Sequence, residues 1–312
     1  MNRTIQDYLL IMLKGIGMGA ADVVPGVSGG TIAFITGIYH ELIDSIKSIN
    51  FPALKLLLSG RFKDFWEAVN ARFLLSLILG IGISIVSLAK GLKYLLDHHP
   101  ILVWSFFFGL IVASAIYVAK DIKKWSTGTF ISLITGAVIA WFITIITPAE
   151  ANTSYLFIFL SGSIAICAMI LPGISGSFIL VLLGMYRFIL GAVSDFNIPV
   201  IAVFLLGAAI GIIAFSNVLS WLLKKYYHLT ISLLAGFMIG SLNKVWPWKQ
   251  VVETFIDRHG IEKPLIEQNV LPTNYLELTG QSPQLVYALL LAAGGFALIF
   301  VVEGLSKKLI KK

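Results

Sequence analysis

The chain alternates long apolar stretches with short polar segments. Six stretches are long enough, at about 20 residues, to form a helix that crosses the hydrocarbon core of a membrane. Each ends at charges, a proline or a polar turn. The pattern therefore predicts six membrane-spanning helices, at residues 72–95, 101–119, 127–147, 198–223, 229–247 and 284–304.

Two further apolar stretches, residues 8–43 and 155–192, are interrupted near their centres by Pro-Gly and Ser-Gly. Each arm of such a stretch has about 15 residues, which is too short to cross a membrane at a rise of about 1.5 Å per residue. We therefore expect two re-entrant hairpins of broken helix. Irregular backbone at membrane depth is tolerated only where it is buried in protein or lines a cavity.

The interruptions repeat. Val24–Gly30 (VPGVSGG) recurs as Leu171–Ser177 (LPGISGS) at an offset of 147 residues, and Gly37 and Tyr39 recur as Gly184 and Tyr186 at the same offset. Each copy precedes three predicted spans, and an odd number of spans places the second copy on the opposite side of the membrane. Inverted repeats with paired breaks are typical of secondary transporters.

The predicted fold class is therefore an all-α polytopic membrane protein of two inverted repeats. Each repeat contains one re-entrant broken-helix hairpin and three transmembrane helices. The first repeat covers residues 1–150 and includes an amphipathic linker at 48–70, which we expect on the inner membrane surface. The second covers residues 151–312 and includes a polar outer loop at 249–283.

Composition and charge agree with this arrangement. Hydrophobic residues make up 58% of the chain and charged residues 12%, which excludes a soluble enzyme. The predicted topology places 15 Lys/Arg and 6 Asp/Glu on one side, and 6 Lys/Arg and 8 Asp/Glu on the other. Basic loops face the cytoplasm, so both termini are expected there. The basic loops that orient the protein in the membrane explain the net charge of +7, so this charge does not indicate a nucleic-acid partner.

The two breaks have the chemistry of an anion site. A half-helix that starts inside the membrane exposes unpaired N–H groups and a partial positive charge. Ser28 and Ser175 occupy the N-cap positions, and glycine allows a ligand to approach the backbone. Phosphate is an anion that such a site typically binds. The predicted phosphate-binding residues are Pro25, Gly26, Ser28, Gly29, Gly30, Thr31, Pro172, Gly173, Ser175, Gly176 and Ser177. The alternative is that both motifs are packing breaks between helices.

Ionisable residues near the breaks are functional candidates, because a charge in the membrane is costly. Asp22 is placed to bind a coupling proton or cation, or to orient the first tip by accepting N–H bonds, and Glu41 is a second coupling candidate. Arg187 follows the second tip by 12 residues, about 18 Å along a helix, and is predicted to capture phosphate at the outer mouth or to be a snorkelling interfacial arginine. At the repeat offset of 147 residues, His40 is the position equivalent to Arg187, and it is expected at the inner mouth.

No motif for catalysis, nucleotide binding or metal binding is present in the sequence. The prediction is therefore a transporter rather than an enzyme, with no metal and no cofactor beyond a coupling proton or sodium ion.

The segment Gly17–Thr31 (GMGAADVVPGVSGGT), together with Leu171–Ser177, resembles the signature of a bacterial and archaeal membrane family that is associated with undecaprenyl phosphate translocation, the PopT family. The resemblance covers nearly the whole chain. It implies a multi-pass cell-membrane flippase, whose partners are the bilayer and a polyprenyl phosphate lipid. This carrier would return from the outer to the inner leaflet by alternating access, with its phosphate at the two tips and Arg187 at the entrance.

Two other classes remain open from the residues alone. A secondary transporter of a small soluble anion predicts a central water-filled cavity with no lateral opening to lipid. An intramembrane enzyme such as a lipid phosphatase predicts a clustered acid/base set or a metal site.

Overall fold

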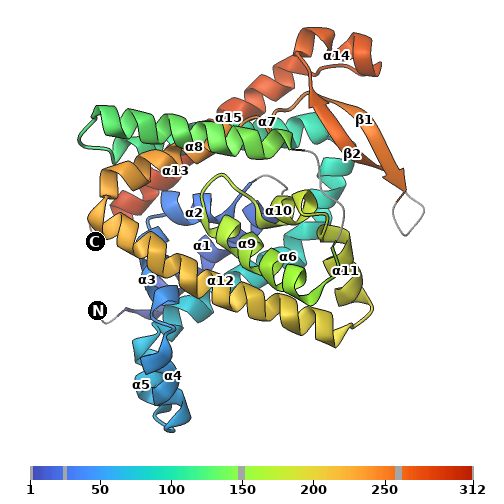
Figure 1. The fold of residues 1–312 in the computed structure, drawn as a ribbon. Coiled ribbons are helices and arrows are strands. Elements are labelled where there is room, and N and C mark those ends of the chain that lie inside the picture. Colours follow the sequence, from blue (N-terminus) through green and yellow to red (C-terminus); the bar gives the residue numbers. More distant parts are fainter. Residues whose placement is uncertain (1–2, 24–26, 147–151, 257–261, 311–312) are drawn as a thin grey trace.

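The computed structural model describes residues 3–23, 27–146, 152–256 and 262–310. Within these residues the chain is a helical bundle with one small β-hairpin (Figure 1). The elements of the first half are α1 (Ile5–Val23), α2 (Gly29–Ile35), α3 (Tyr39–Lys47), α4 (Phe51–Leu58), α5 (Phe62–Ala68), α6 (Ala71–His98), α7 (Pro100–Lys120) and α8 (Thr127–Ile145). Those of the second half are α9 (Tyr155–Ile170), α10 (Gly176–Leu182), α11 (Tyr186–Ser194), α12 (Ile198–Lys225), α13 (Tyr227–Ser241), β1 (Lys249–Ile256), β2 (Glu262–Asn269), α14 (Pro272–Thr279) and α15 (Leu285–Ile310).

The predicted spans largely coincide with observed helices. Within the described residues, α6, α7, α8 and α12 are each long and apolar enough to cross a membrane, and the bent pair α10–α11 would be a fifth span if counted as one. The chain is a multi-pass membrane protein. The predicted span at 229–247 is too long, because α13 ends at Ser241 and turns follow. The span at 284–304 lies within α15.

Each interrupted stretch consists of three helices rather than the two arms expected from the sequence. After the Pro-Gly break a second break follows, at Gly37 in the first half and at Gly184 in the second. Both glycines have a left-handed backbone, with φ of 74° and 68°. The residue after each glycine donates its N–H to a carbonyl five positions earlier, which is the Schellman ending of a helix. The second pair, α10 and α11, is bent by 112°.

The bounds of the short helices follow the sequence repeat. α10 and α11 lie 147 residues after α2 and α3 at both ends. The structural elements after the two Pro-Gly motifs therefore share the register of the repeat. The opposite orientation of the two halves in the membrane stays a prediction.

Four tight helix pairs hold the bundle together: α1 with α6, α9 with α12, α7 with α15, and α8 with α13. One helix of each pair presents a glycine to a backbone carbonyl of its partner, at Gly80, Gly207, Gly109 and Gly236. A β-carbon at any of these positions would overlap that carbonyl. Small residues allow this close approach in lipid, where apolar burial contributes little to helix association. The pair α1–α6 lies within the first half and the pair α9–α12 within the second. The pairs α7–α15 and α8–α13 join the two halves.

The linker at 48–70 forms two short helices, α4 and α5, and not one. They are separated by Gly60, whose φ is 73°. The two helices extend away from the bundle (Figure 1). Phe51, Leu58 and Phe62 are exposed on them, as expected of an amphipathic segment. Its place on the inner membrane surface stays a prediction.

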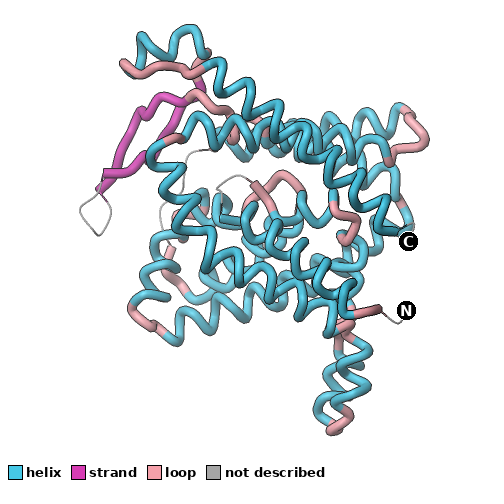
Figure 2. Tube along the Cα trace, turned by 180° about the vertical axis from the view of Figure 1, so that it is seen from behind, coloured by secondary structure: helices cyan, strands magenta, loops and turns pink. Residues whose placement is uncertain are grey.

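The polar loop at 249–283 contains a β-hairpin and a helix that composition did not reveal. β1 and β2 pair antiparallel, with an irregularity around Glu253. The indole N–H of Trp246 donates to the Val270 carbonyl (2.8 Å), and that of Trp248 donates to the Pro283 carbonyl (2.8 Å). Both views show the ends of the chain near each other, away from the β-hairpin (Figures 1 and 2).

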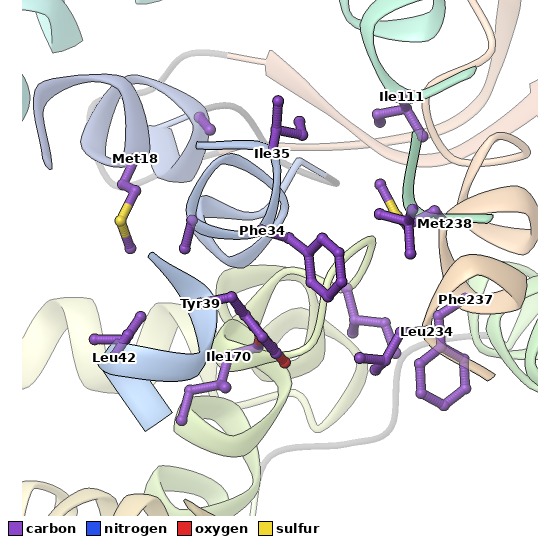
Figure 3. Packing of buried hydrophobic residues seen from close by; sticks show 14 of the residues in the cluster. Met18, Phe34, Ile35, Tyr39, Leu42, Ile111, Ile170, Leu234, Phe237 and Met238 are labelled. Carbon is purple, nitrogen blue, oxygen red and sulfur yellow. The ribbon is translucent and has the colours of Figure 1, made fainter. Parts of the chain in front are cut away.

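The largest buried apolar cluster joins the two halves at the centre of the bundle. Phe34 and Tyr39, from the first hairpin, lie between Ile170 at the end of α9 and Met238 of α13 (Figure 3). The two breaks in the chain therefore meet in the protein interior, where irregular backbone is shielded from lipid.

Candidate functional site

The first tip is the segment Val27–Thr31, at the start of α2. Its hydrogen bonds are largely internal. Ser28 is the N-cap of α2, and its hydroxyl accepts the N–H of Gly30 (3.0 Å). The Asp22 carboxylate at the end of α1 accepts the N–H of Gly29 (2.7 Å). The buried start of α2 therefore uses two of its free N–H groups inside the protein, and Asp22 orients this tip.

The first tip also contacts the end of α9 directly. The Ser28 hydroxyl lies within donor distance of the carbonyls of Met169 (3.0 Å) and Leu171 (3.1 Å). The Tyr39 hydroxyl donates to the Ile170 carbonyl (3.2 Å). The last carbonyls of a helix lack partners within the helix, so these hydroxyls satisfy groups that would otherwise be buried without a partner.

The second tip is the segment Leu171–Ser177, which leads into α10. The N–H of Gly173 donates to the Thr31 hydroxyl (3.1 Å), which completes the contact between the tips. Gly173 has a φ of 87° and lies against the backbone of α13 at Met238. Ser175 occupies the N-cap position, but its side chain makes no cap bond to α10; its hydroxyl is hydrogen-bonded to that of Ser177 (2.9 Å). Pro172 is buried in the same turn.

A small recess with a cavity volume of about 10 Å³, close to the space that one water molecule needs, lies beside the second tip. We call it the outer recess, because it lies at the end of the bundle that carries the β-hairpin, and the predicted topology places this end outside. Its walls come from the second tip and the start of α10, from α8, and from the end of α13 with the turn that follows. They consist of Gly173, Ile174, Ser175, Phe178, Ala140, Ile143, Thr144, Ser241 and Lys244. Of the described residues of the two tips, only those of the second tip line this recess.

Lys244 is the charged residue of the outer recess, and the sequence analysis did not single it out. Its ammonium lies 4.8 Å from the centre of the Phe178 ring and 3.7 Å from the Glu267 carboxylate of β2. Lys244 could have been identified from the sequence, because it lies within the predicted span 229–247 and charges in apolar segments are functional candidates.

A second and larger recess, with a cavity volume of about 120 Å³, lies at the opposite end of α13. We call it the inner recess. Here His40 stacks on the ring of Tyr227 at 5.8 Å, and Asp44 accepts hydrogen bonds from Ser220 (2.9 Å) and Lys224 (3.3 Å). His40, predicted at the inner mouth, therefore lies in a hollow of the surface. α13 has 15 residues and separates this recess from the outer one.

Glu41 and Arg187 belong to other elements than the tips, namely α3 and α11. Glu41 forms a two-bond ion pair with Arg3 (2.5 and 2.7 Å) and accepts a bond from Asn70 (2.9 Å), so it is separate from Asp22. Arg187 is exposed on α11, beyond the 112° bend. The 18 Å expected along a straight helix is therefore wrong, and Arg187 does not line the outer recess. Pro25 and Gly26 lie outside the described residues.

Gly29, Gly30 and Gly176 are all buried. A β-carbon at Gly29 would overlap the Asp22 carboxylate, one at Gly30 the Ile170 carbonyl, and one at Gly176 the Ala165 carbonyl. These glycines are therefore required by packing, whatever ligand the tips receive. In the part of the chain that the structure describes, no three His, Cys, Asp or Glu side chains are grouped as metal ligands.

Comparison with known proteins identifies relatives along most of the chain. Residues 18–263 match the model of a family described as undecaprenyl phosphate translocase-like. A polyprenyl-phosphate transporter of Vibrio cholerae serotype O1 is 45% identical over 302 residues, which are 97% of this chain and 98% of the relative. A polyprenyl-phosphate transporter of Staphylococcus aureus is 34% identical over 255 residues, 76% of this chain and 85% of the relative. No solved structure matches significantly.

Proposed function

Because the chain belongs to the undecaprenyl phosphate translocase-like family, we propose that it carries polyprenyl phosphate across the cell membrane, from the outer to the inner leaflet. The observation that carries this proposal is the 45% identity to a polyprenyl-phosphate transporter over nearly the full length of both chains. The protein moves its substrate and performs no covalent step. Its termini lie in the cytoplasm, as the charge distribution indicates.

The phosphate group binds where the second tip meets the outer recess. Ser175 and Ser177 supply hydroxyls, and the start of α10 supplies backbone N–H groups and a partial positive charge. The prenyl tail stays in the lipid. The support for this step is the opening of the recess onto Gly173 and Ser175, whereas the first tip is bonded to Asp22 and to the end of α9.

Transport then requires the two tips to exchange roles. The first tip leaves the α9 carbonyls, the phosphate passes between Ser28–Thr31 and Ser175–Ser177, and the inner recess opens beside His40. A proton or sodium gradient drives this exchange, with Asp22 as the coupling group at the tip and Glu41 as the second coupling group. Arg187 attracts phosphate from the outer surface.

Leaflet-resolved flipping of undecaprenyl phosphate in proteoliposomes tests the proposal. Replacing Ser175 and Ser177 by alanine removes two hydroxyls without adding bulk, and we expect transport to fall about 10-fold or more, as for the loss of charge-assisted hydrogen bonds. Bulky residues at Gly176 would be a poorer test, because they would overlap α9.

Ser126→Ala is the matched control, because it removes a capping hydroxyl from α8 far from the tips. We expect it to retain transport. Uptake of soluble phosphate without lipid flipping would identify the protein as a small-anion transporter instead. Flipping at the full rate by the double alanine variant would exclude the second tip as the site.

A further inference from the structure

The turn after α13 and the first residue of β1 each carry a lysine, Lys244 and Lys249, and both converge on one carboxylate. The Glu267 carboxylate oxygen lies 3.7 Å from the Lys244 ammonium and 3.4 Å from the Lys249 ammonium. Each ammonium also lies over an aromatic ring, Lys244 at 4.8 Å from Phe178 and Lys249 at 4.6 Å from Trp104. Two cations and one anion leave this cluster with one uncompensated positive charge.

The two lysines have different positions. Lys244 lines the outer recess together with Ser175. Lys249 does not line it, and its side chain is only 8% exposed. The Lys249 ammonium donates instead to the backbone carbonyl of Lys244 (2.7 Å). Lys249 is therefore a positioning residue that holds the turn carrying Lys244.

The β-hairpin holds Glu267 in place beside them. The Asn269 amide donates to the carbonyl of Asn243 (2.7 Å) and lies 2.9 Å from its side-chain oxygen. The Asn243 amide donates to the Thr144 hydroxyl (2.7 Å), and Thr144 also lines the recess. This chain of bonds connects β2, the turn and α8, so Glu267 reaches the two lysines from a fixed strand.

We propose that Lys244 binds the phosphate group of the substrate in the outer recess, and that Glu267 occupies Lys244 as an internal anion when the recess is empty. The inference rests on the proposed function for the lipid source of the phosphate, but the site itself requires only a phosphate group. A phosphate carries more charge and more acceptor oxygens than one carboxylate, so it displaces Glu267, widens the recess, and bonds Lys244 and Ser175 together.

If this proposal holds, removing one partner of the ion pair lowers the affinity for phosphate, and removing the charge of the other raises it. Removing Lys244 removes the cation that binds phosphate, whereas removing the charge of Glu267 removes a competitor. A salt bridge with a merely structural role would give the same sign for both variants, since either change breaks it. The comparison of signs is therefore the decisive measurement.

The experiment measures binding to the full chain in lipid nanodiscs. The probes are a short-chain prenyl phosphate, inorganic phosphate and the corresponding prenyl alcohol. For Lys244→Ala we expect prenyl phosphate affinity to fall about 10-fold or more, and for Glu267→Gln to rise several-fold. In the double variant the gain from Glu267→Gln should disappear. Lys63→Ala on the exposed α5 is the matched control for the loss of one lysine, with unchanged binding.

The outcomes separate this inference from the proposed function. If inorganic phosphate binds with the same dependence on Lys244 and prenyl phosphate does not, the site is supported and the lipid substrate is rejected. If Lys244→Ala binds both probes as tightly as the unmodified protein, or Glu267→Gln weakens binding while the protein remains folded, the inference is overturned. In that case flipping by the unmodified protein would still support the proposed function.

Discussion

The two tips carry closely similar residues and yet differ in their surroundings. At the first tip, Asp22 and Ser28 accept the N–H groups of Gly29 and Gly30. At the second tip, the residue equivalent to Asp22 is Met169, and the Ser175 hydroxyl turns to Ser177 and makes no cap. The first tip is thus bonded within the protein, whereas the second lies beside a recess with a lysine. A repeated motif becomes two different sites because one acidic residue is present in one copy only.

The largest expected effect comes from breaking the contact between the tips. Gly30→Ala would place a methyl group against the Ile170 carbonyl. Overpacking in a tight interior costs about 1–3 kcal/mol, and here the obstacle is backbone that has no rotamer to change. We expect a lower unfolding temperature in detergent and the loss of most transport.

Gly82→Ala is the control for that variant, because a β-carbon at Gly82 meets no atom within 4 Å. Alanine is favoured over glycine in a helix by about 1 kcal/mol, so this change should be neutral or stabilising. Equal stability of the Gly30→Ala protein would mean that the tips do not meet in this way.

A smaller effect should distinguish orientation from coupling at Asp22. Asp22→Asn keeps an oxygen that accepts the Gly29 N–H but removes the charge. We expect the stability to change by less than about 1 kcal/mol, since the asparagine side-chain oxygen accepts the same Gly29 N–H. The gradient-driven rate of flipping should fall at least 10-fold, whereas exchange without a gradient should persist. A variant that still responds fully to imposed proton and sodium gradients would limit Asp22 to its capping role.

The smallest effect concerns the pH of the outer solution. Burial beside Trp104 lowers the pKa of Lys249 to about 8, despite the opposing influence of Glu267. Above pH 8 the Lys249 ammonium loses its proton, so the cluster of Lys244, Lys249 and Glu267 loses its net positive charge. Phosphate binding should therefore weaken about two- to threefold between pH 7 and pH 9, as expected for the loss of one nearby charge in a partly hydrated site.

Lys249→Arg is the control, because arginine remains charged throughout this range. Its binding should not change between pH 7 and pH 9. Unfolding does not explain a fall in binding, because the pKa of Lys249 is lower in the folded than in the unfolded chain. The unfolded state binds more protons between the two values, so this group increases stability as the pH rises. The same decline in both proteins would exclude Lys249 as its cause.

Much of the fold could be predicted from the sequence because its signals are local. Hydropathy located most spans, and Pro-Gly with Ser-Gly located both breaks. The second breaks at Gly37 and Gly184 were visible as matched glycines, but their left-handed backbone depends on hydrogen bonds to the preceding turn. The end of α13 was placed six residues too late, since Leu242, Val245 and Trp246 count as apolar while the backbone there already turns.

The candidate site was only partly predictable, because its assembly depends on contacts between distant segments. The tips were identified from residue types, but the bond from Ser28 to the end of α9 joins positions more than 140 residues apart. Lys244 acquires its place only when α13, α10 and β2 come together. Arg187 was placed along a straight helix, and the bend at Gly184 removes that geometry.

The pairing of α7 with α15 has a consequence for how the protein is made. Gly109 of α7 rests against the Ala292 carbonyl of α15, the last helix of the chain. When ribosomal synthesis proceeds from the N-terminus, α7 enters the membrane long before its partner exists. Until nearly the whole chain has been translated, the face of α7 that carries Gly109 contacts lipid or an insertion factor instead of α15. A protein truncated before α15 would therefore leave this face of α7 without its partner helix.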